Sequence, residues 1–227
     1  NRGKELFIQP NGNPVFLHPE FKGLQANWSD QLDLANVQKI TIIDRPMENK
    51  RFGPGWSWAD YSYYYQAEVS SFPMYGNMLW VEWDSIRQSA LIAPDYLSDY
   101  TEVDFDRDKR GIRIKRDEFV NQYELTIGNA IRNNYVRTAP FRFETYTITK
   151  ILEDTFFRPV NYNYSFKTLD AEGFQFVPLD TVYRKMMLES DNFIAEQILL
   201  SASGQLNDTL SSRRAIEYMF EGAFEKW

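Results

Sequence analysis

The chain has 227 residues and a formal net charge of −7, from 25 basic and 32 acidic side chains. Since no basic stripe accompanies this acidic balance, the composition argues against nucleic acid as a partner. The absence of cysteine excludes disulfides and thiolate metal sites. A single histidine, His18, is too few for a multi-histidine metal centre, and its Pro-flanked setting predicts a turn at the surface.

The first part of the chain reads as strands separated by turns. Residues 5–9 form an apolar run that ends in a turn cluster at residues 10–14. Residues 38–44 are rich in β-branched side chains and predict a buried strand. Residues 79–83 alternate, with Leu79, Val81 and Trp83 on one face, and predict a further strand.

Aromatic residues make up 16% of the chain. Their densest cluster lies at residues 56–65 and contains Trp56, Trp58, Tyr61, Tyr63, Tyr64 and Tyr65. Such a cluster serves either as a platform for sugars or as a structural plug over a sheet face. We favour the buried plug.

Residues 95–118 are strongly charged, with Glu102, Asp104, Asp106 and Asp108 at alternate positions. The spacing superficially resembles a calcium loop, but Lys109 and Arg110 follow where further oxygen ligands are needed. We therefore expect a solvated turn and no metal. Residues 111–115, 122–127 and 134–138 then predict strands of an antiparallel meander.

The remainder of the chain is richer in helical patterns. Residues 143–157 predict a helix, and residues 160–166 alternate like a strand. Asp180 is a candidate N-cap for the next helix, and Ser211 or Ser212 for the last one. The apolar stripe of the last helix runs through Ile216, Met219, Phe220, Ala223, Phe224 and Trp227. The chain is thus predicted to be α+β, with a β-rich region at residues 1–138 and a helix-rich region at residues 139–227.

A polar step, Ser190-Asp191-Asn192, interrupts two helical patterns and sets a hydroxyl and a carboxamide two residues apart. By itself such a tripeptide is typical of helix capping. Its flanks add information, because the run MMLESDNFIAEQILL resembles the second active-site motif of the penicillin-binding D-Ala-D-Ala carboxypeptidases and endopeptidases of the class C, low-molecular-mass type.

Two upstream stretches carry the same resemblance. Residues 52–77 are similar to the segment that this family carries between its first two catalytic motifs, in the order PGW, W-D, YY, A-V-S and N. Gly12-Asn13-Pro14 is similar to the family's Gly-Asp-Pro step, with Asn13 standing where the family has Asp. Residues 84–134 have no counterpart in the resemblance.

The resemblance implies an antiparallel β-rich inserted region followed by helices of an incomplete serine β-lactamase/transpeptidase-like catalytic domain. It implies acyl transfer without a cofactor, with Ser190 as a catalytic proton relay and Asn192 as a substrate-binding amide. The implied partners are peptidoglycan stem peptides, β-lactams in the complete enzyme, and the remainder of the catalytic domain. The implied location is the periplasmic side of the bacterial cell envelope, after export.

The family's other two motifs do not occur in this sequence. No serine is followed by lysine at the Ser-x-x-Lys spacing, since Lys167 lies only two positions after Ser165. Lys167-Thr168-Leu169 lacks the glycine of Lys-Thr-Gly. We therefore expect a middle segment of the enzyme that is inactive alone. The alternatives are a non-catalytic envelope protein of the same fold that binds peptidoglycan or a partner, and a carbohydrate-binding β-domain that uses the cluster at residues 56–65.

Overall fold

The computed structural model describes residues 4–24, 34–165, 173 and 177–223. Its contacts group the chain into two compact units, each assembled from separate stretches of sequence. The first unit comprises Asn1–Pro54, Val69–Gly76 and Arg158–Trp227, and the second comprises Gly55–Glu68 and Asn77–Phe157. Both units combine strands with helix, which confirms the predicted α+β class. The predicted domain boundary after residue 138 stays a prediction.

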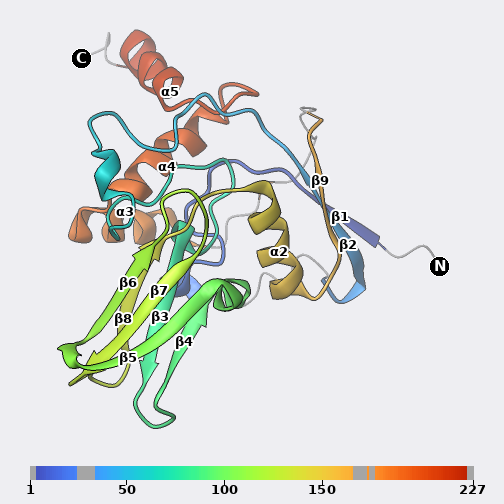
Figure 1. Cartoon of the computed structure of the whole chain (residues 1–227). Helices are drawn as coiled ribbons and strands as arrows, with labels where there is room; N and C mark the ends of the chain where they lie inside the picture. The colour runs from blue at the N-terminus through green and yellow to red at the C-terminus, as the bar shows by residue number, and fades with distance from the viewer. Residues whose placement is uncertain (1–3, 25–33, 166–172, 174–176, 224–227) are drawn as a thin grey trace. The chain divides into compact units, whose positions relative to one another are not determined.

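The first unit contains a parallel sheet of three strands, in the order β1, β2, β9 (Figure 1). These strands are β1 (Lys4–Ile8), β2 (Val37–Ile43) and β9 (Val160–Asn163). The central strand β2 buries Ile40 and Ile42 completely, as expected for a β-branched run in the middle of a parallel sheet. The strands predicted at residues 5–9 and 38–44 are confirmed, while the predicted strand at residues 160–166 ends earlier, at Asn163.

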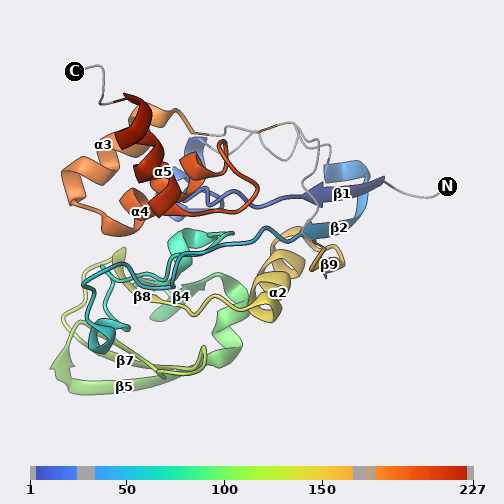
Figure 2. The same cartoon turned by 90° about the horizontal axis from the view of Figure 1, so that it is seen from above.

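The first unit also contains three helices that lie together in both views (Figures 1 and 2). They are α3 (Leu179–Glu189), α4 (Asn192–Ser203) and α5 (Ser212–Tyr218), and a π-helical turn, Met219–Ala223, follows α5. Ser211 caps α5 by accepting a hydrogen bond from the Arg214 N–H at 3.4 Å, as predicted. The predicted cap at Asp180 is wrong, because α3 already begins at Leu179, after Pro178. Phe224 and Trp227 of the predicted stripe lie outside the described residues.

The second unit contains two three-stranded sheets and the helix α2 (Thr145–Phe156). In one sheet, β3 (Met78–Asp84) pairs antiparallel with both β4 (Ser89–Ala93) and β8 (Tyr135–Pro140). In the other, β7 (Tyr123–Asn129) lies between β5 (Thr101–Arg110) and β6 (Ile112–Arg116).

The predicted antiparallel meander is correct for the pair β6 and β7 only. The strand predicted at residues 134–138 exists as β8, but it pairs with β3 in the other sheet. The predicted helical stripe is confirmed, since α2 buries Ile148, Ile151 and Leu152 completely.

The charged run is not a solvated turn, because residues 101–110 form the ten-residue strand β5. Its carboxylates alternate with Val103 and Phe105, which is the period of a strand. Val103 lies opposite Leu125 of β7, and Phe105 lies opposite Ile127, in parallel register. Because β5 is at the edge of its sheet, its charged side chains remain in water, and an edge strand tolerates them.

The aromatic cluster at residues 56–65 is not a buried plug. Trp58 is 60% exposed, and Tyr63, Tyr64 and Tyr65 are also exposed, whereas Trp56 and Tyr61 are half-buried. The rings of Trp58 and Tyr61 stack at a centroid distance of 6.5 Å. Since most of these rings contact water, the sugar-platform alternative remains open.

We predict that Trp58→Ala lowers the free energy of unfolding by less than about 1 kcal/mol, because little apolar surface of this ring is buried. The matched control is Phe141→Ala in the same unit, where the side chain is fully buried and the cost should be about 3–5 kcal/mol. Urea unfolding of both variants provides the measurement. Equal losses in the two variants would contradict the surface position of Trp58.

Candidate functional site

The candidate site is the junction between α3 and α4, where Ser190, Asp191 and Asn192 follow one another. Ser190 ends α3 in the left-handed conformation, with φ 53° and ψ 45°. Asp191 is the N-cap of α4, and its side chain accepts a hydrogen bond from the Ile194 N–H at 2.9 Å. Asn192 is the first residue of α4. The polar step predicted between two helices is therefore present, and Asp191 holds the turn.

Ser190 and Asn192 are both exposed. Their side chains are therefore accessible to another molecule or to another part of a protein. A hydroxyl can accept and donate a proton, and a carboxamide can both donate to and accept from a peptide group. This pair can thus bind an amide-containing substrate and move a proton, while their assignment to catalysis stays a prediction.

Gln197 fixes α4 within the first unit. Its Oε1 accepts from the Ser70 N–H at 2.9 Å, and its Nε2 donates to the carbonyls of Ser70, at 3.0 Å, and Gly12, at 2.8 Å. The side chain is completely buried, so these three backbone groups are satisfied by one amide. Gln197 lies five residues after Asn192 on the same helix and therefore helps to set where α4 begins.

Gly12 approaches α4 so closely that a side chain would not fit well. Its φ of +79° favours glycine, and a Cβ would lie 3.3 Å from the Ser201 nitrogen. The Gly12 N–H in turn donates to the Ser71 carbonyl at 2.8 Å. Gly12 and Ser70 belong to the two upstream stretches that resemble the family. The backbone of both stretches thus contacts α4, through the side chain of Gln197. Sequence reasoning gave Gln197 no role, although it lies inside the resembling run.

His18 is buried, so its predicted surface position is wrong. Its Nδ1 accepts from the Glu20 N–H at 3.3 Å, and its ring meets the edge of Phe21. Burial, assisted by the nearby positive charge of Lys185, lowers the pKa of His18 to about 3. Lys185 of α3 is held by Glu20 and by Glu189, at 2.6 Å from the latter. His18 is therefore a neutral structural residue.

The buried His18 predicts a specific pH dependence. An unfolded histidine takes up a proton near pH 6.5, whereas folded His18 remains neutral until about pH 3. Acidification therefore favours the unfolded state, and the free energy of unfolding should fall by about 1.4 kcal/mol per pH unit below pH 6.5. Urea unfolding between pH 6.5 and pH 5 measures this slope. His18→Gln should flatten it, and an unchanged slope in that variant would exclude His18 as the cause.

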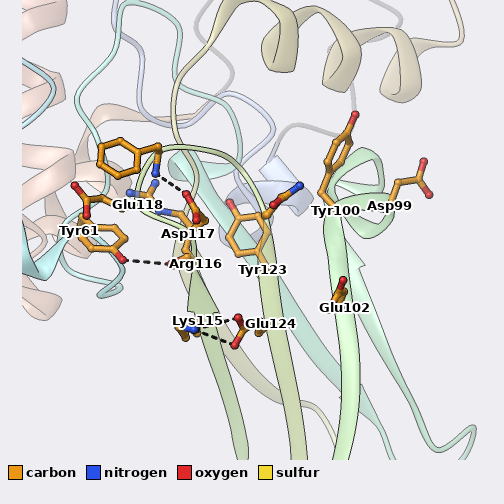
Figure 3. Close-up of a pocket in the computed structure, with 12 residues that line it drawn as sticks. Tyr61, Asp99, Tyr100, Glu102, Lys115, Arg116, Asp117, Glu118, Tyr123 and Glu124 are labelled. Carbon is orange, nitrogen blue, oxygen red and sulfur yellow. Dashed lines mark hydrogen bonds and ion pairs between the residues drawn. The ribbon is translucent and has the colours of Figure 1, made fainter.

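A pocket of about 480 Å³ in the second unit is a different kind of site (Figure 3). Its lining includes Arg116, which is buried with its ion-pair partner Glu68, at 3.5 Å between Nη1 and Oε1. Tyr61 packs on the guanidinium, with 5.0 Å to the ring centre. On the neighbouring strands, Lys115 pairs with Glu124 at 3.0 Å. The Arg116 and Glu68 pair is a structural support for this unit.

Two further features bear on ligand classes. Within the described ranges, no group of three or more His, Cys, Asp or Glu side chains is arranged to hold a metal ion. Among the same residues, no helix combines the length and apolar character needed to cross a membrane.

No protein-family model matches the sequence, and no curated protein matches it significantly. Among solved structures, the chain is similar to penicillin binding protein 4 (dacB) from Haemophilus influenzae, with a TM-score of 0.58 and 15% sequence identity. That likeness covers 97% of this chain and 53% of the other. A structure of the same protein complexed with a novel β-lactam gives a TM-score of 0.48 and 13% identity, over 98% of this chain and 54% of the other.

The chain has the fold of a penicillin-binding protein, and the resemblance predicted from the sequence is confirmed at that level. A solved protein that shares this fold is penicillin binding protein 4. The chain spans about half the length of the solved structures that it matches.

Proposed function

We propose that this chain supplies the Ser-x-Asn step of a serine-type D-Ala-D-Ala carboxypeptidase or endopeptidase that acts on peptidoglycan stem peptides. The observation that carries the proposal is the position of Ser190 and Asn192 at a capped, solvent-exposed helix junction. The fold likeness over 97% of the chain supports it. On this proposal the protein works in the bacterial cell envelope, on the periplasmic side.

The proposed reaction is acyl transfer through a serine ester. The nucleophile is the serine of the Ser-x-x-Lys motif, which this sequence lacks. That serine attacks the carbonyl carbon of the peptide bond between two D-alanines, and the lysine of the same motif accepts its proton. The carbon–nitrogen bond breaks as the Ser190 hydroxyl gives its proton to the departing D-Ala nitrogen, and Ser190 takes up in turn the proton that the lysine had accepted. Water then hydrolyses the ester. Asn192 holds the substrate's peptide group, and neither step needs a metal or an organic cofactor.

The second candidate is a non-catalytic envelope protein of the same fold that binds peptidoglycan or a partner. These 227 residues contain neither Ser-x-x-Lys nor Lys-Thr-Gly, and this candidate holds if neither motif occurs on either side of the segment. Lys167-Thr168-Leu169, which lacks the glycine, lies outside the described residues. Sequencing the gene on both sides of this segment distinguishes the two candidates, since only the enzyme requires both motifs there.

We predict that the 227-residue chain alone forms no covalent adduct with a fluorescent β-lactam, because it lacks the nucleophile motif. Gel fluorescence after denaturation is the measurement, with an intact penicillin-binding protein as the positive control. A stoichiometric label on this chain would contradict the proposal that the nucleophilic serine lies outside this sequence.

A complete enzyme tests Ser190 directly. Ser190→Ala removes the proton relay but leaves the turn nearly unchanged, so acylation should fall about a hundred- to ten-thousand-fold with little change in melting temperature. Asp191→Ala is the matched control, since loss of this cap should lower stability by about 1 kcal/mol with a smaller effect on acylation. If Ser190→Ala is acylated at the wild-type rate, the junction is only a capping step.

A further inference from the structure

The pocket of the second unit contains a buried guanidinium with two unused hydrogen-bond donors (Figure 3). Arg116 lines this pocket, and its side chain is only 1% exposed. Its Nη1 lies 3.5 Å from Glu68 Oε1 and 3.4 Å from the Pro140 carbonyl. Its Nε and Nη2 are buried and donate to no acceptor among the residues that the structure describes. Because buried polar groups almost always have a partner, this pair of N–H groups suits an acceptor on another molecule.

The ring of Tyr61 covers one face of this guanidinium, with 5.0 Å between Cζ and the ring centre. The N–H bonds of a guanidinium point outward in its plane, so a ring on its face does not use them. Tyr61 is only half-buried, and its hydroxyl donates to the Arg116 carbonyl over 3.4 Å, longer than an ordinary O–H···O bond. The ring is therefore weakly held and can tilt to let an acceptor reach Nε and Nη2.

The charges around the pocket favour a neutral acceptor over an anion. Glu68, which is itself buried, already neutralises Arg116, and Lys115 is engaged by Glu124. The lining carboxylates that form no ion pair with any described residue are Asp99, Glu102, Asp117 and Glu118. A carboxylate or phosphate in this pocket would be repelled by Glu68 and by the rim. The acceptor that fits is a neutral oxygen.

The rim adds exposed aromatic rings and hydrogen-bond acceptors. Phe119 and Tyr100 both line the pocket, and they are 65% and 38% exposed. The Asp117 Oδ1 accepts from the N–H groups of Phe119 and Val120 at 2.7 and 3.1 Å, which fixes the turn that carries Phe119. A pyranose has apolar C–H groups on its faces and hydroxyls around its edge. It can therefore contact aromatic rings and carboxylates at the same time.

We propose that this pocket binds a short neutral saccharide that carries an acetamido group. The acetamido carbonyl accepts from Arg116 Nε and Nη2, after the Tyr61 ring tilts aside. An amide oxygen suits this place because it has two lone pairs for the two donors and no proton of its own. The sugar ring packs on Phe119, and its hydroxyls donate to Asp117 and Glu118.

This inference goes beyond the proposed acyl transfer and does not depend on it, since none of these residues belongs to the Ser190 junction. The site shares Tyr61 with the aromatic cluster at residues 56–65, but it places the sugar in the pocket and on Arg116. The pocket volume of about 480 Å³ lies within the usual range for small-molecule sites.

The test uses the 227-residue chain and chitotriose, a neutral trimer of N-acetylglucosamine. Isothermal titration calorimetry should show saturable binding at millimolar concentrations with little dependence on salt, because no net charges are paired. Heteronuclear N–H NMR in the same titration should show a shift of the Arg116 Nε–H resonance. The matched probe is the deacetylated glucosamine trimer, which lacks the acetamido carbonyls and carries positive charge. It should bind more weakly than chitotriose.

Three results in these titrations would overturn the proposal. One is a lack of saturable chitotriose binding, and another is an Arg116 Nε–H resonance that stays unshifted at saturation. The third is binding of the deacetylated trimer that is as tight as that of chitotriose, since the rim carboxylates alone would then explain it.

Protein variants test the donors and the aromatic rim separately. Arg116→Lys keeps a positive charge beside Glu68 but removes the two donors, so chitotriose binding should weaken at least about tenfold. Phe119→Ala changes an exposed side chain, so it should weaken binding about tenfold with an unchanged melting temperature. The matched control is Phe157→Ala, whose ring is 82% exposed and lies outside the pocket lining. It should bind like the wild type.

The variants also give results that would refute the saccharide site. Wild-type affinity in Phe119→Ala would remove the sugar from this rim, and that variant remains informative even if Arg116→Lys lowers the stability of the fold. An equal loss of binding in Phe157→Ala would show that exposed aromatic rings bind the probe without a specific site.

Discussion

The buried amide of Gln197 is the interaction on which the first unit depends most. One side chain satisfies both the N–H and the carbonyl of Ser70, together with the carbonyl of Gly12. A buried peptide group without a partner costs about 1–3 kcal/mol, so three such groups fix the position of α4 strongly. The position of α4 also sets the position of the junction at Ser190, because Asn192 is the first residue of α4. The position of the exposed residues Ser190 and Asn192 therefore depends on the completely buried side chain of Gln197.

The helix junction itself needs little long-range support. The Asp191 carboxylate caps α4 locally, and the left-handed Ser190 ends α3. Local hydrogen bonds thus shape the turn, while Gln197 and the close approach of Gly12 decide where the turn lies. These two sets of contacts fix the backbone that carries the exposed side chains of Ser190 and Asn192.

The sequence predicts correctly those elements that carry a clear hydrophobic period or a capping residue of their own. The β-branched run of β2, the stripe of α2 and the polar break before α4 each carried a strong period or a capping residue. The candidate residues Ser190 and Asn192 were found in the same way, with the help of a family resemblance. The contacts of Gln197 with Gly12 and Ser70 could not be predicted, since they join positions 185 and 127 residues apart.

The errors have a common physical origin in tertiary context. The charges of β5 indicated a turn, but pairing with β7 at a sheet edge lets carboxylates point into water from a regular strand. The Pro-flanked turn at His18 predicts a surface position, and the turn exists, yet the ring is buried and packs against Phe21. The density of aromatic residues at 56–65 and the family resemblance favour a structural plug over a sheet face, but Trp58 stacks on Tyr61 while most of its ring stays exposed.

The most direct test of this account is the stability of Gln197→Met, which keeps the length of the side chain but removes its amide. Gln205→Met, at an exposed position after the same helix, is the matched control. The account predicts that urea unfolding of Gln197→Met shows a loss of at least about 3 kcal/mol, with almost none in the control. A loss below about 1 kcal/mol in Gln197→Met would contradict the claim that this amide anchors α4 and the junction at Ser190.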